Sequence, residues 1–487
     1  MKKEDIDSLK EIKKLGFNPY AHKFEKNTDI SKIIENYKKL KPDQKDEKAK
    51  LKIAGRIRSV RGHGKLYFFD LEDISGKIQL YIDAKNISKK ELMLVKLLHP
   101  GDIVGVQGSV VKTKRGELSV LVKEISILTR ALTPLPTEWF GLKDQETRYR
   151  KRYLDMIMHP EVRDMLIKKS IFWNSMREFL IKKGFTEIDT PVLENKTGGA
   201  DAKPFVTHHN ALDIDVYLRI SAGELWQKRL MIGGFEKTFE IGRVFRNEGI
   251  SPEHAQDYKQ MEFYWAYADY EMGMNLVEEM IKYIAKETFG TLKFKIGKFD
   301  VNLGKKWEKY DYAKEIKNKT KIDINKTNLE KIKKKLKELK IEYEEEGFNL
   351  ARGIDNLWKY CRKEIAGPGF LINEPLVTSP LAKKKEKNPN ITERFHVLIA
   401  GSELGNGYSE LNDPVDQAER FAEQKKLREA GDEEAQMYDK DFVEALEHGM
   451  PPTCGFGMSE RLFSFLMNKP IKECQAFPLL RPTEKED

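Results

Sequence analysis

Between Leu51 and Leu128 the chain contains five short segments in which apolar, often β-branched residues partly alternate with polar ones. Turns rich in glycine or aspartate separate these segments, which is the usual pattern of short β-strands. So many strands in so short a stretch predict a small closed barrel. Five-stranded barrels commonly bind single-stranded nucleic acid on one face, so this region is a candidate nucleic-acid site.

The sequence changes character on both sides of this barrel. Residues 1–50 have apolar residues spaced three to four apart, which predicts a helical extension. The barrel domain is predicted over 51–130, and the proline-containing, charged stretch 131–150 is predicted to be a linker. Residues 151–487 alternate long helical patterns with strand-like runs, which predicts one large domain. Its Lys- and Glu-rich stretch at about 305–365 is predicted to be a helical insertion.

The composition fits a globular protein. With 40% hydrophobic and 34% charged residues, the chain is too apolar for a disordered protein and too charged for a membrane protein. No stretch approaches the roughly 20 apolar residues of a membrane span, and the N-terminus has no signal-peptide core, so we expect a cytoplasmic protein. Three widely spaced cysteines argue against disulfides and zinc sites. The net charge of +9 is compatible with a polyanionic partner.

Two segments supply side chains suited to binding phosphate groups. The chain has neither a P-loop sequence nor a glycine-rich dinucleotide fingerprint, so phosphates must be bound by side chains such as arginine. In FRNEGISPEHAQDYKQMEFYWAYADY, a strand delivers Arg246, a loop carries Glu248 and His254, and a second strand returns. Four residues share one face of the return strand: Tyr258, Gln260, Glu262 and Tyr264. In GFGMSERLFSFL, glycines allow close approach to a ligand and Arg461 begins a helix.

These segments resemble motifs 2 and 3 of the class II aminoacyl-tRNA synthetases, and GFTEIDTPVL at 184–193 resembles motif 1. The whole chain is similar in order to the class II lysyl-tRNA synthetases. The similar segments include GFNPYAHKF, GKIQLY, GLKDQETRYRKRYLD, TGGADAKPFVTHHNALDIDVYLRI, GSELGNGYSELNDPVDQAERF, ALEHGMPPTCGFG and FPLLRP. The resemblance implies an α+β fold, with an N-terminal OB-fold barrel before a class II catalytic domain built on an antiparallel sheet. It also implies ATP-dependent ligation of L-lysine to tRNA(Lys) through lysyl-adenylate, for translation.

The resemblance assigns roles around ATP. Arg246 would hold the α-phosphate and the amino-acid carboxylate. This carboxylate is itself the nucleophile, so catalysis would depend on alignment and on stabilising charge at phosphorus. Tyr258 and Arg461 would enclose the adenine. Glu248 would accept a hydrogen bond from the adenine amine, and His254 would lie near the γ-phosphate.

Lysine specificity follows from the same resemblance and from charge. A lysine substrate carries two ammonium groups, and a desolvated cation needs carboxylate partners. Glu262, Tyr264 and Glu410 fall where the family contacts the side-chain ammonium. Glu224 and Gly199 fall near the α-amino group, in a chain whose segment ISAGELWQKRL is one residue longer than usual. The same wall includes Asn406 and Tyr408.

The resemblance also implies Mg²⁺ bound together with the ATP phosphates. Glu403 matches a family ligand and joins Arg246 and Arg461 as a candidate catalytic residue, whereas His396 stands at the companion position that is usually acidic. A neutral imidazole is a poor partner for Mg²⁺. Three interpretations stay open: Glu403 suffices with water and phosphate, Glu410 contributes, or fewer metal ions bind. The segment GFGMSER is also one residue shorter than usual before its arginine.

In the barrel, the resemblance is to an anticodon-binding face. Phe68 would stack on a base and Gln79 would read the central uridine. Arg61 and Glu117 would contact the neighbouring nucleotides. Adjacent residues of a strand point to opposite faces, so either Phe68 or Phe69 belongs to the barrel core.

Motif 1, which ends at Pro191, builds the dimer interface in this class, so the resemblance implies a homodimer. Three other functions stay open. An aspartyl or asparaginyl enzyme is disfavoured because Glu262 and Glu410 would face its substrate. A lysine ligase that modifies a translation factor would resemble the catalytic domain without a barrel. An inactive RNA-binding paralogue would have lost the arginines of motifs 2 and 3, which this chain retains.

Overall fold

A computed structural model describes residues 3–136, 142–200, 202–249, 251–343, 345, 348–430 and 435–483. The chain divides into two compact units, Met1–Arg148 and Tyr149–Asp487. Among the described helices, none combines the length and the apolar character needed to cross a bilayer.

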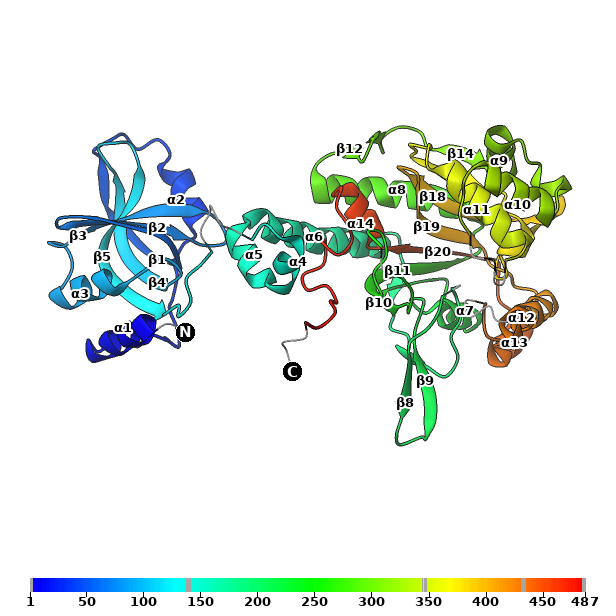
Figure 1. Cartoon of the computed structure of the whole chain (residues 1–487), viewed down its shortest axis with the longest axis horizontal. Helices are drawn as coiled ribbons and strands as arrows, with labels where there is room; N and C mark the ends of the chain where they lie inside the picture. Colours follow the sequence, from blue (N-terminus) through cyan, green and yellow to red (C-terminus); the bar gives the residue numbers. More distant parts are fainter. Residues whose placement is uncertain are drawn as a thin grey trace. The chain divides into compact units, whose positions relative to one another are not determined.

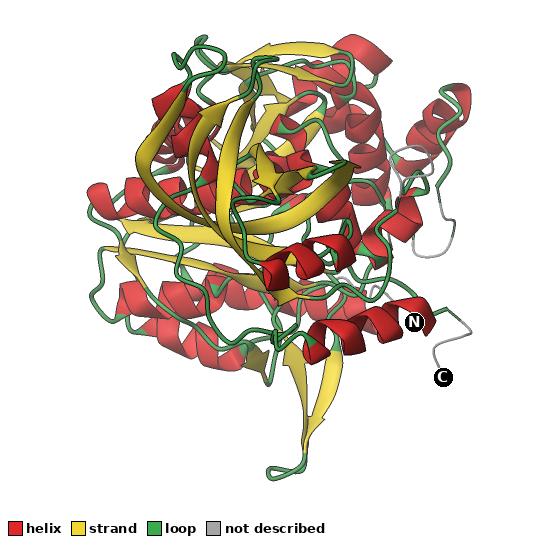
Figure 2. Ribbon diagram, turned by 90° about the vertical axis from the view of Figure 1, so that its left-hand side faces the viewer, coloured by secondary structure: helices red, strands yellow, loops and turns green. Residues whose placement is uncertain are grey.

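The first unit contains a closed five-stranded barrel with strand order β1-β2-β3-β5-β4, as the sequence predicted. Figure 2 shows how strongly these strands curve. Helix α3, which the sequence analysis did not identify, begins with a capping box in which Ser88 and Glu91 bond to each other's backbone. The elements are α1 (Lys3–Lys14), α2 (Ile30–Tyr37), β1 (Lys45–His63), β2 (Leu66–Glu72), β3 (Lys77–Asp83), α3 (Lys89–Leu97), β4 (Ile103–Lys112) and β5 (Leu118–Thr129).

Apolar side chains at alternate positions fill the barrel. Phe69 is fully buried together with Ile53, Leu80 and Val106. Its neighbour Phe68 points to the other face of β2 and is half-buried. The sequence had left open which phenylalanine is core, and the structure assigns that place to Phe69.

The second unit is built on an eight-stranded sheet with the order β14-β15-β18-β19-β20-β11-β10-β6 (Figure 1). Only its outermost pairs, β14 with β15 and β10 with β6, are parallel, so the predicted antiparallel sheet is confirmed. Its strands are β6 (Thr186–Glu187), β10 (Lys237–Phe245), β11 (Asp257–Ala266), β14 (Glu308–Asp311), β15 (Gly369–Ile372), β18 (Arg394–Ile399), β19 (Ser402–Ser409) and β20 (Thr453–Ser459).

One face of this sheet packs against the long helices α6 (Pro160–Lys182) and α8 (Tyr270–Phe289). Phe263 of β11 and Phe456 of β20 point into this core. Because side chains alternate along a strand, the intervening residues of β11 face the opposite side of the sheet. That second face carries an apolar cluster around Tyr264 and Tyr408, and it also holds a cavity.

The second unit also contains smaller groups of helices and strands. Helices α9 to α11 pack around a core of their own, within the range where the sequence predicted a helical insertion. The β8–β9 hairpin projects from the unit in both views (Figures 1 and 2). The other helices are α4 (Gln145–Arg150), α5 (Arg152–Met158), α7 (Glu224–Ile232), α9 (Tyr312–Thr320), η1 (Ile324–Lys326), α10 (Leu329–Glu338), α11 (Leu350–Arg362), η2 (Leu376–Thr378), α12 (Pro414–Glu429), α13 (Lys440–Glu447) and α14 (Arg461–Leu466). The other strands are β7 (Leu193–Glu194), β8 (Val206–His209), β9 (Ile214–Leu218), β12 (Lys293–Ile296), β13 (Phe299–Asn302), β16 (Lys384–Lys385) and β17 (Asn388–Thr392).

The two phenylalanines of β2 give a test of the barrel core. Phe69→Ala removes a fully buried ring, so we expect the barrel to lose about 3 to 5 kcal/mol of stability. Hydrogen–deuterium exchange of peptides from residues 45–129 in the full-length chain measures this loss directly. Phe68→Ala is the matched control and should change exchange far less. Equal exchange in the two variants would contradict the assignment.

Candidate active site

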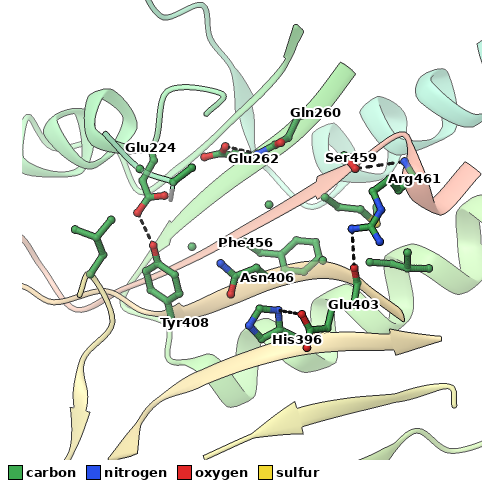
Figure 3. Close-up of a pocket in the computed structure, with 18 of the residues that line it drawn as sticks. Glu224, Gln260, Glu262, His396, Glu403, Asn406, Tyr408, Phe456, Ser459 and Arg461 are labelled. Carbon is green, nitrogen blue, oxygen red and sulfur yellow. Dashed lines mark hydrogen bonds and ion pairs between the residues drawn. The ribbon is translucent and has the colours of Figure 1, made fainter. Parts of the chain in front are cut away.

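A cavity of about 470 Å³ lies on the sheet face opposite α6 and α8 (Figure 3). Every residue that the sequence analysis assigned to ATP, to lysine or to Mg²⁺ lines it. These residues are Gly199, Glu224, Arg246, Glu248, His254, Tyr258, Glu262, Tyr264, His396, Glu403, Asn406, Tyr408, Glu410 and Arg461. The structure therefore brings together side chains that are more than 260 positions apart along the chain.

Strand β20 leaves room for the side chains of its neighbours β11 and β19. It has glycine at the position where both neighbours carry bulky groups. Gly455 pairs with Tyr264 on one side and with Tyr408 on the other. A Cβ atom on Gly455 would lie 2.2 Å from Glu410 Oε1 and 2.6 Å from the Tyr264 ring. Glycine is thus required at this position by close approach of the neighbouring side chains.

One end of the cavity is lined by buried carboxylates. Glu262 Oε1 accepts hydrogen bonds from the backbone N–H of Ala222 at 2.7 Å and from Gln260 Nε2 at 2.6 Å. Its Oε2 accepts one from the hydroxyl of Tyr264 at 3.2 Å. Burial and the nearby charge of Glu224 raise the pKa of Glu262 to about 7. The group is therefore costly to ionise unless a cation binds beside it.

Glu224 and Glu410 share a cation that the sequence analysis missed. Lys228 Nζ lies 2.7 Å from Glu224 Oε1 and 2.6 Å from Glu410 Oε2. The hydroxyl of Tyr408 also donates to Glu224 (Figure 3). Glu224 is in the cavity wall at the first turn of α7, against Gly199. The available signal for Lys228 was its spacing, one helical turn after Glu224.

Arginines line the rest of the cavity. Arg246 follows β10, and its Nε donates to the backbone oxygen of Ile220 at 3.2 Å. Its guanidinium lies 5.8 Å from the centre of the Tyr258 ring. Arg461 Nη1 donates to the backbone oxygen of Glu403 at 3.2 Å, as Figure 3 shows. Arg461 also forms an ion pair with Glu253, which the sequence analysis did not assign.

The polar loop after Arg246 also contributes to the cavity wall. His254 Nδ1 lies 2.7 Å from the hydroxyl of Ser251. Burial lowers the pKa of His254, and the positive charge of Arg461 lowers it further. Glu248, from the same loop, is half-buried.

Of the three candidate metal ligands, Glu403 and His396 lie close together, whereas Glu410 lies apart from them. Glu403 Oε1 accepts a hydrogen bond from the Trp358 indole, and its Oε2 lies 3.9 Å from His396 Nδ1. The other ring nitrogen of His396 lies 2.8 Å from Glu374 Oε1. Glu410 is seven positions beyond Glu403 along β19, roughly 23 Å for an extended strand. Glu410 therefore does not reach an ion held by Glu403.

His396 is positioned as a partner of a buried carboxylate. Burial would raise the pKa of Glu374, but the charges of Arg394 and His396 lower it to about 2. Both nitrogens of His396 face carboxylates, so the ring is not presented as a free metal ligand. Within the part of the chain that the structure describes, no group of three or more His, Cys, Asp or Glu side chains is placed to hold a metal ion.

The barrel brings its predicted residues to neighbouring strands. Phe68 stacks on Tyr81, with ring centres 5.3 Å apart and an angle of 24° between the planes. Arg61 is directly opposite Phe68 in the β1–β2 ladder. Gln79 Oε1 accepts a hydrogen bond from the hydroxyl of Ser119 at 3.0 Å, and Glu117 is exposed nearby in sequence. Tyr81 extends this aromatic surface and had not been assigned.

Both units match families of known proteins. The family described as tRNA synthetases class II (D, K and N) matches residues 144–481, which cover the whole cavity. The chain belongs to this family of class II tRNA synthetases. The family described as OB-fold nucleic acid binding domain matches residues 51–128 of this class II synthetase. The predicted fold class and family resemblance are thereby confirmed.

Several relatives match this synthetase over almost their full length. A protein named lysine--tRNA ligase from Thermosipho africanus is 45% identical over 100% of this chain and 97% of its own length. One of the same name from Thermotoga maritima has the same identity and coverage. A third, from Carboxydothermus hydrogenoformans, is 42% identical over 98% of this chain and 97% of its own length.

A buried carboxylate next to α7 makes the stability of the catalytic unit depend on pH. Trp226 Nε1 donates to Glu194 Oε1 at 2.8 Å, and Glu194 Oε2 is buried without a hydrogen-bond partner among the described residues. Burial raises the pKa of Glu194 from 4.5 to about 7. The protonated form therefore favours the folded state, and this advantage is lost as the pH rises from about 4.5 through 7.

Glu194→Gln keeps an oxygen acceptor for Trp226 but cannot ionise. We expect the variant to exceed the wild type in unfolding free energy by up to roughly 3 kcal/mol at pH 8. The difference should disappear near pH 4.5. Urea unfolding followed by tryptophan fluorescence at several pH values measures it. A difference that does not change with pH would count against a raised pKa.

Proposed function

We propose that this chain catalyses the ATP-dependent ligation of L-lysine to tRNA(Lys) through a lysyl-adenylate intermediate, in translation. The observation that carries the proposal is the group of three buried carboxylates in the cavity, Glu224, Glu262 and Glu410. The names of relatives that are 42 to 45% identical over nearly the whole chain support it.

The charge of the cavity matches a diamino acid. Each ammonium group of lysine loses its water on binding and needs charged hydrogen-bond acceptors in return. Glu262 and Glu410 are proposed to receive the side-chain ammonium with Tyr264, and Glu224 and Gly199 the α-amino group. Asn406 and Tyr408 would line the same wall. An aspartate or asparagine substrate would bring no second cation, and aspartate would be repelled.

Adenylation needs alignment more than a nucleophilic side chain. A carboxylate oxygen of lysine attacks the α-phosphorus of ATP, the bond from this phosphorus to the bridging oxygen breaks, and pyrophosphate leaves. Arg246 is proposed to hold the α-phosphate and the attacking carboxylate, which stabilises the charge that develops at phosphorus. Tyr258 and Arg461 would enclose the adenine. Glu248 would bind the adenine amine, and His254 would lie near the γ-phosphate.

Transfer to tRNA follows in the same cavity. The 3′-hydroxyl of the terminal ribose attacks the carbonyl carbon of lysyl-adenylate, and AMP leaves. In the barrel, Phe68 is proposed to stack on an anticodon base and Gln79 to read the central uridine. Arg61 and Glu117 would contact the neighbouring nucleotides.

Mg²⁺ is the proposed cofactor, and Glu403 is the residue that would hold it. Mg²⁺ bound to nucleotides typically has only one or two carboxylate ligands, the others being phosphate oxygens and water. A single carboxylate therefore fits this requirement, whereas His396 and Glu410 do not add to it in the geometry described above. The ion would neutralise phosphate charge during adenylation.

We further propose a homodimer that acts in the cytoplasm. Apolar side chains are exposed along α6 and after Pro191. They include Ile167 at 46%, Ile171 at 39%, Ile181 at 52%, Val192 at 43% and Leu193 at 50% exposure. A dimer interface over these positions would remove these apolar side chains from water.

Amino-acid-dependent ATP–pyrophosphate exchange with all twenty amino acids, with and without unfractionated tRNA, tests the proposed function. Exchange with lysine alone is the expected result. Exchange with aspartate or asparagine would mean that the carboxylates do not face the substrate side chain. No exchange with any amino acid would favour an RNA-binding protein without this activity.

The variant Glu262→Gln tests the role of one carboxylate. Because a charge-assisted hydrogen bond contributes about 1.5 to 3 kcal/mol, the KM for lysine should rise roughly 10- to 100-fold. The KM for ATP should change little. In the wild type, the KM for lysine should fall as the pH rises through 7 because the pKa of Glu262 is about 7 and the charged form binds ammonium. Equal effects on lysine and ATP would contradict the assignment.

The variant Phe68→Ala tests the barrel. Since stacking of one base contributes about 1 to 3 kcal/mol, the KM for tRNA(Lys) should rise roughly 5- to 100-fold. Pyrophosphate exchange with lysine, which needs no tRNA, should be unchanged. Tyr20→Ala, at an exposed aromatic of the same unit, is the control. An unchanged KM for tRNA would remove Phe68 from the proposed anticodon site.

A further inference from the structure

Lys228 is a buried cation directly behind the carboxylate end of the cavity. Its side chain is 1% exposed and does not line the cavity itself. The Nζ atom lies between Glu224 and Glu410, and it is 5.5 Å and 5.8 Å from the ring centres of Tyr408 and Phe442. Both rings are at a distance at which an aromatic face attracts a cation. Carboxylates and aromatic rings therefore surround the ammonium group.

The position of Lys228 is fixed by its helix. Glu224 and Lys228 are four residues apart on α7, so their side chains meet on one face of the helix. Glu410 follows β19, far from α7 along the chain, and forms an ion pair with this lysine. Burial alone would lower the pKa of Lys228, but the charges of Glu224 and Glu410 raise it above its usual value. The ammonium group therefore stays charged.

The charges at this end of the cavity can be counted. When all three carboxylates are ionised, Glu224, Glu262 and Glu410 against one ammonium give a charge of −2. A bound lysine brings two ammonium groups, while its carboxylate faces the arginines. Without Lys228 the count would be −3, which exceeds the two positive charges that lysine brings and leaves buried carboxylates without their partner.

We propose that Lys228 is a positioning residue for substrate specificity, which orients Glu224 and Glu410 and sets the charge of the pocket to match the two ammonium groups of lysine. This inference rests on the proposed function. A purely structural role would require only that Lys228 stabilise the fold. Charge matching additionally requires that the affinity for lysine follow the net charge of the pocket.

The first test is Lys228→Met, which keeps the length and apolar stem of the side chain. The KM for lysine in pyrophosphate exchange should rise at least tenfold, while the KM for ATP should stay within about twofold. Lys282→Met is the control, because Lys282 pairs with Glu278 at the same spacing on α8, away from the cavity. A lysine KM that changes less than twofold would overturn the proposal, as would equal rises for lysine and ATP.

The second test compares Glu224→Gln with the double variant Lys228→Met/Glu224→Gln. The single change leaves a net charge of −1, whereas the double change restores −2. The double variant should therefore have the lower KM for lysine, although it carries one more substitution. The reverse order would overturn the proposal. This comparison holds even if Lys228→Met alone does not fold.

The wild type, measured beside the variants, separates this inference from the proposed function. If the wild type shows no lysine-dependent exchange, both fail. If the wild type is active and the variants do not behave as described, only the role of Lys228 fails.

Discussion

The catalytic unit depends on burying like charges close together. Glu224, Glu262 and Glu410 are each at most 6% exposed and line one end of a single cavity. Removing such groups from water costs several kcal/mol each unless partners compensate, and the repulsion among them adds to the cost. The sheet, its packed helices and the lysine behind the cavity must supply that compensation before any substrate arrives.

The sheet contributes to this compensation because side chains alternate between its two faces. On β11, Phe263 packs into the core with α6 and α8, and Glu262 and Tyr264 on either side face the cavity. The same strand therefore anchors the unit and presents the charged groups. The glycine in β20 completes this arrangement, because any side chain at Gly455 would displace Glu410 or Tyr264.

Much of the site could be predicted from the sequence because its residues occur in short motifs that resemble those of a known family. The two-residue period correctly grouped Tyr258, Glu262 and Tyr264, and the five strands correctly indicated the barrel. The spacing of Lys228 from Glu224 was a local signal, but Glu410, its second partner, and Arg461, the partner of Glu253, belong to elements that are distant in the chain. Their pairing depends on how the strands and helices assemble, which no local pattern encodes.

The sequence analysis also missed helix α3 and the surroundings of His396. The capping box of α3 is a local signal, yet the short helix lies inside a stretch that otherwise reads as strands. His396 stood out only as a departure from an acidic position. Its neighbour Glu374 is on a separate segment of the chain, so the ion pair between them emerges only from the folded structure.

The β10–β11 pairing restricts how this site can change over evolution. In this antiparallel ladder Glu262 is opposite Glu240, and Phe263 is opposite Phe239. Inserting or deleting one residue in β11 would exchange the two faces, turning Glu262 and its neighbours toward the core. The turn before α7 is constrained as well, because the backbone N–H of Ala222 donates to Glu262 and Gly223 has a positive φ of 78°. Pocket chemistry in this scaffold can therefore diversify by substitution at alternate strand positions, whereas a change in length within β11 would turn the pocket residues away from the cavity.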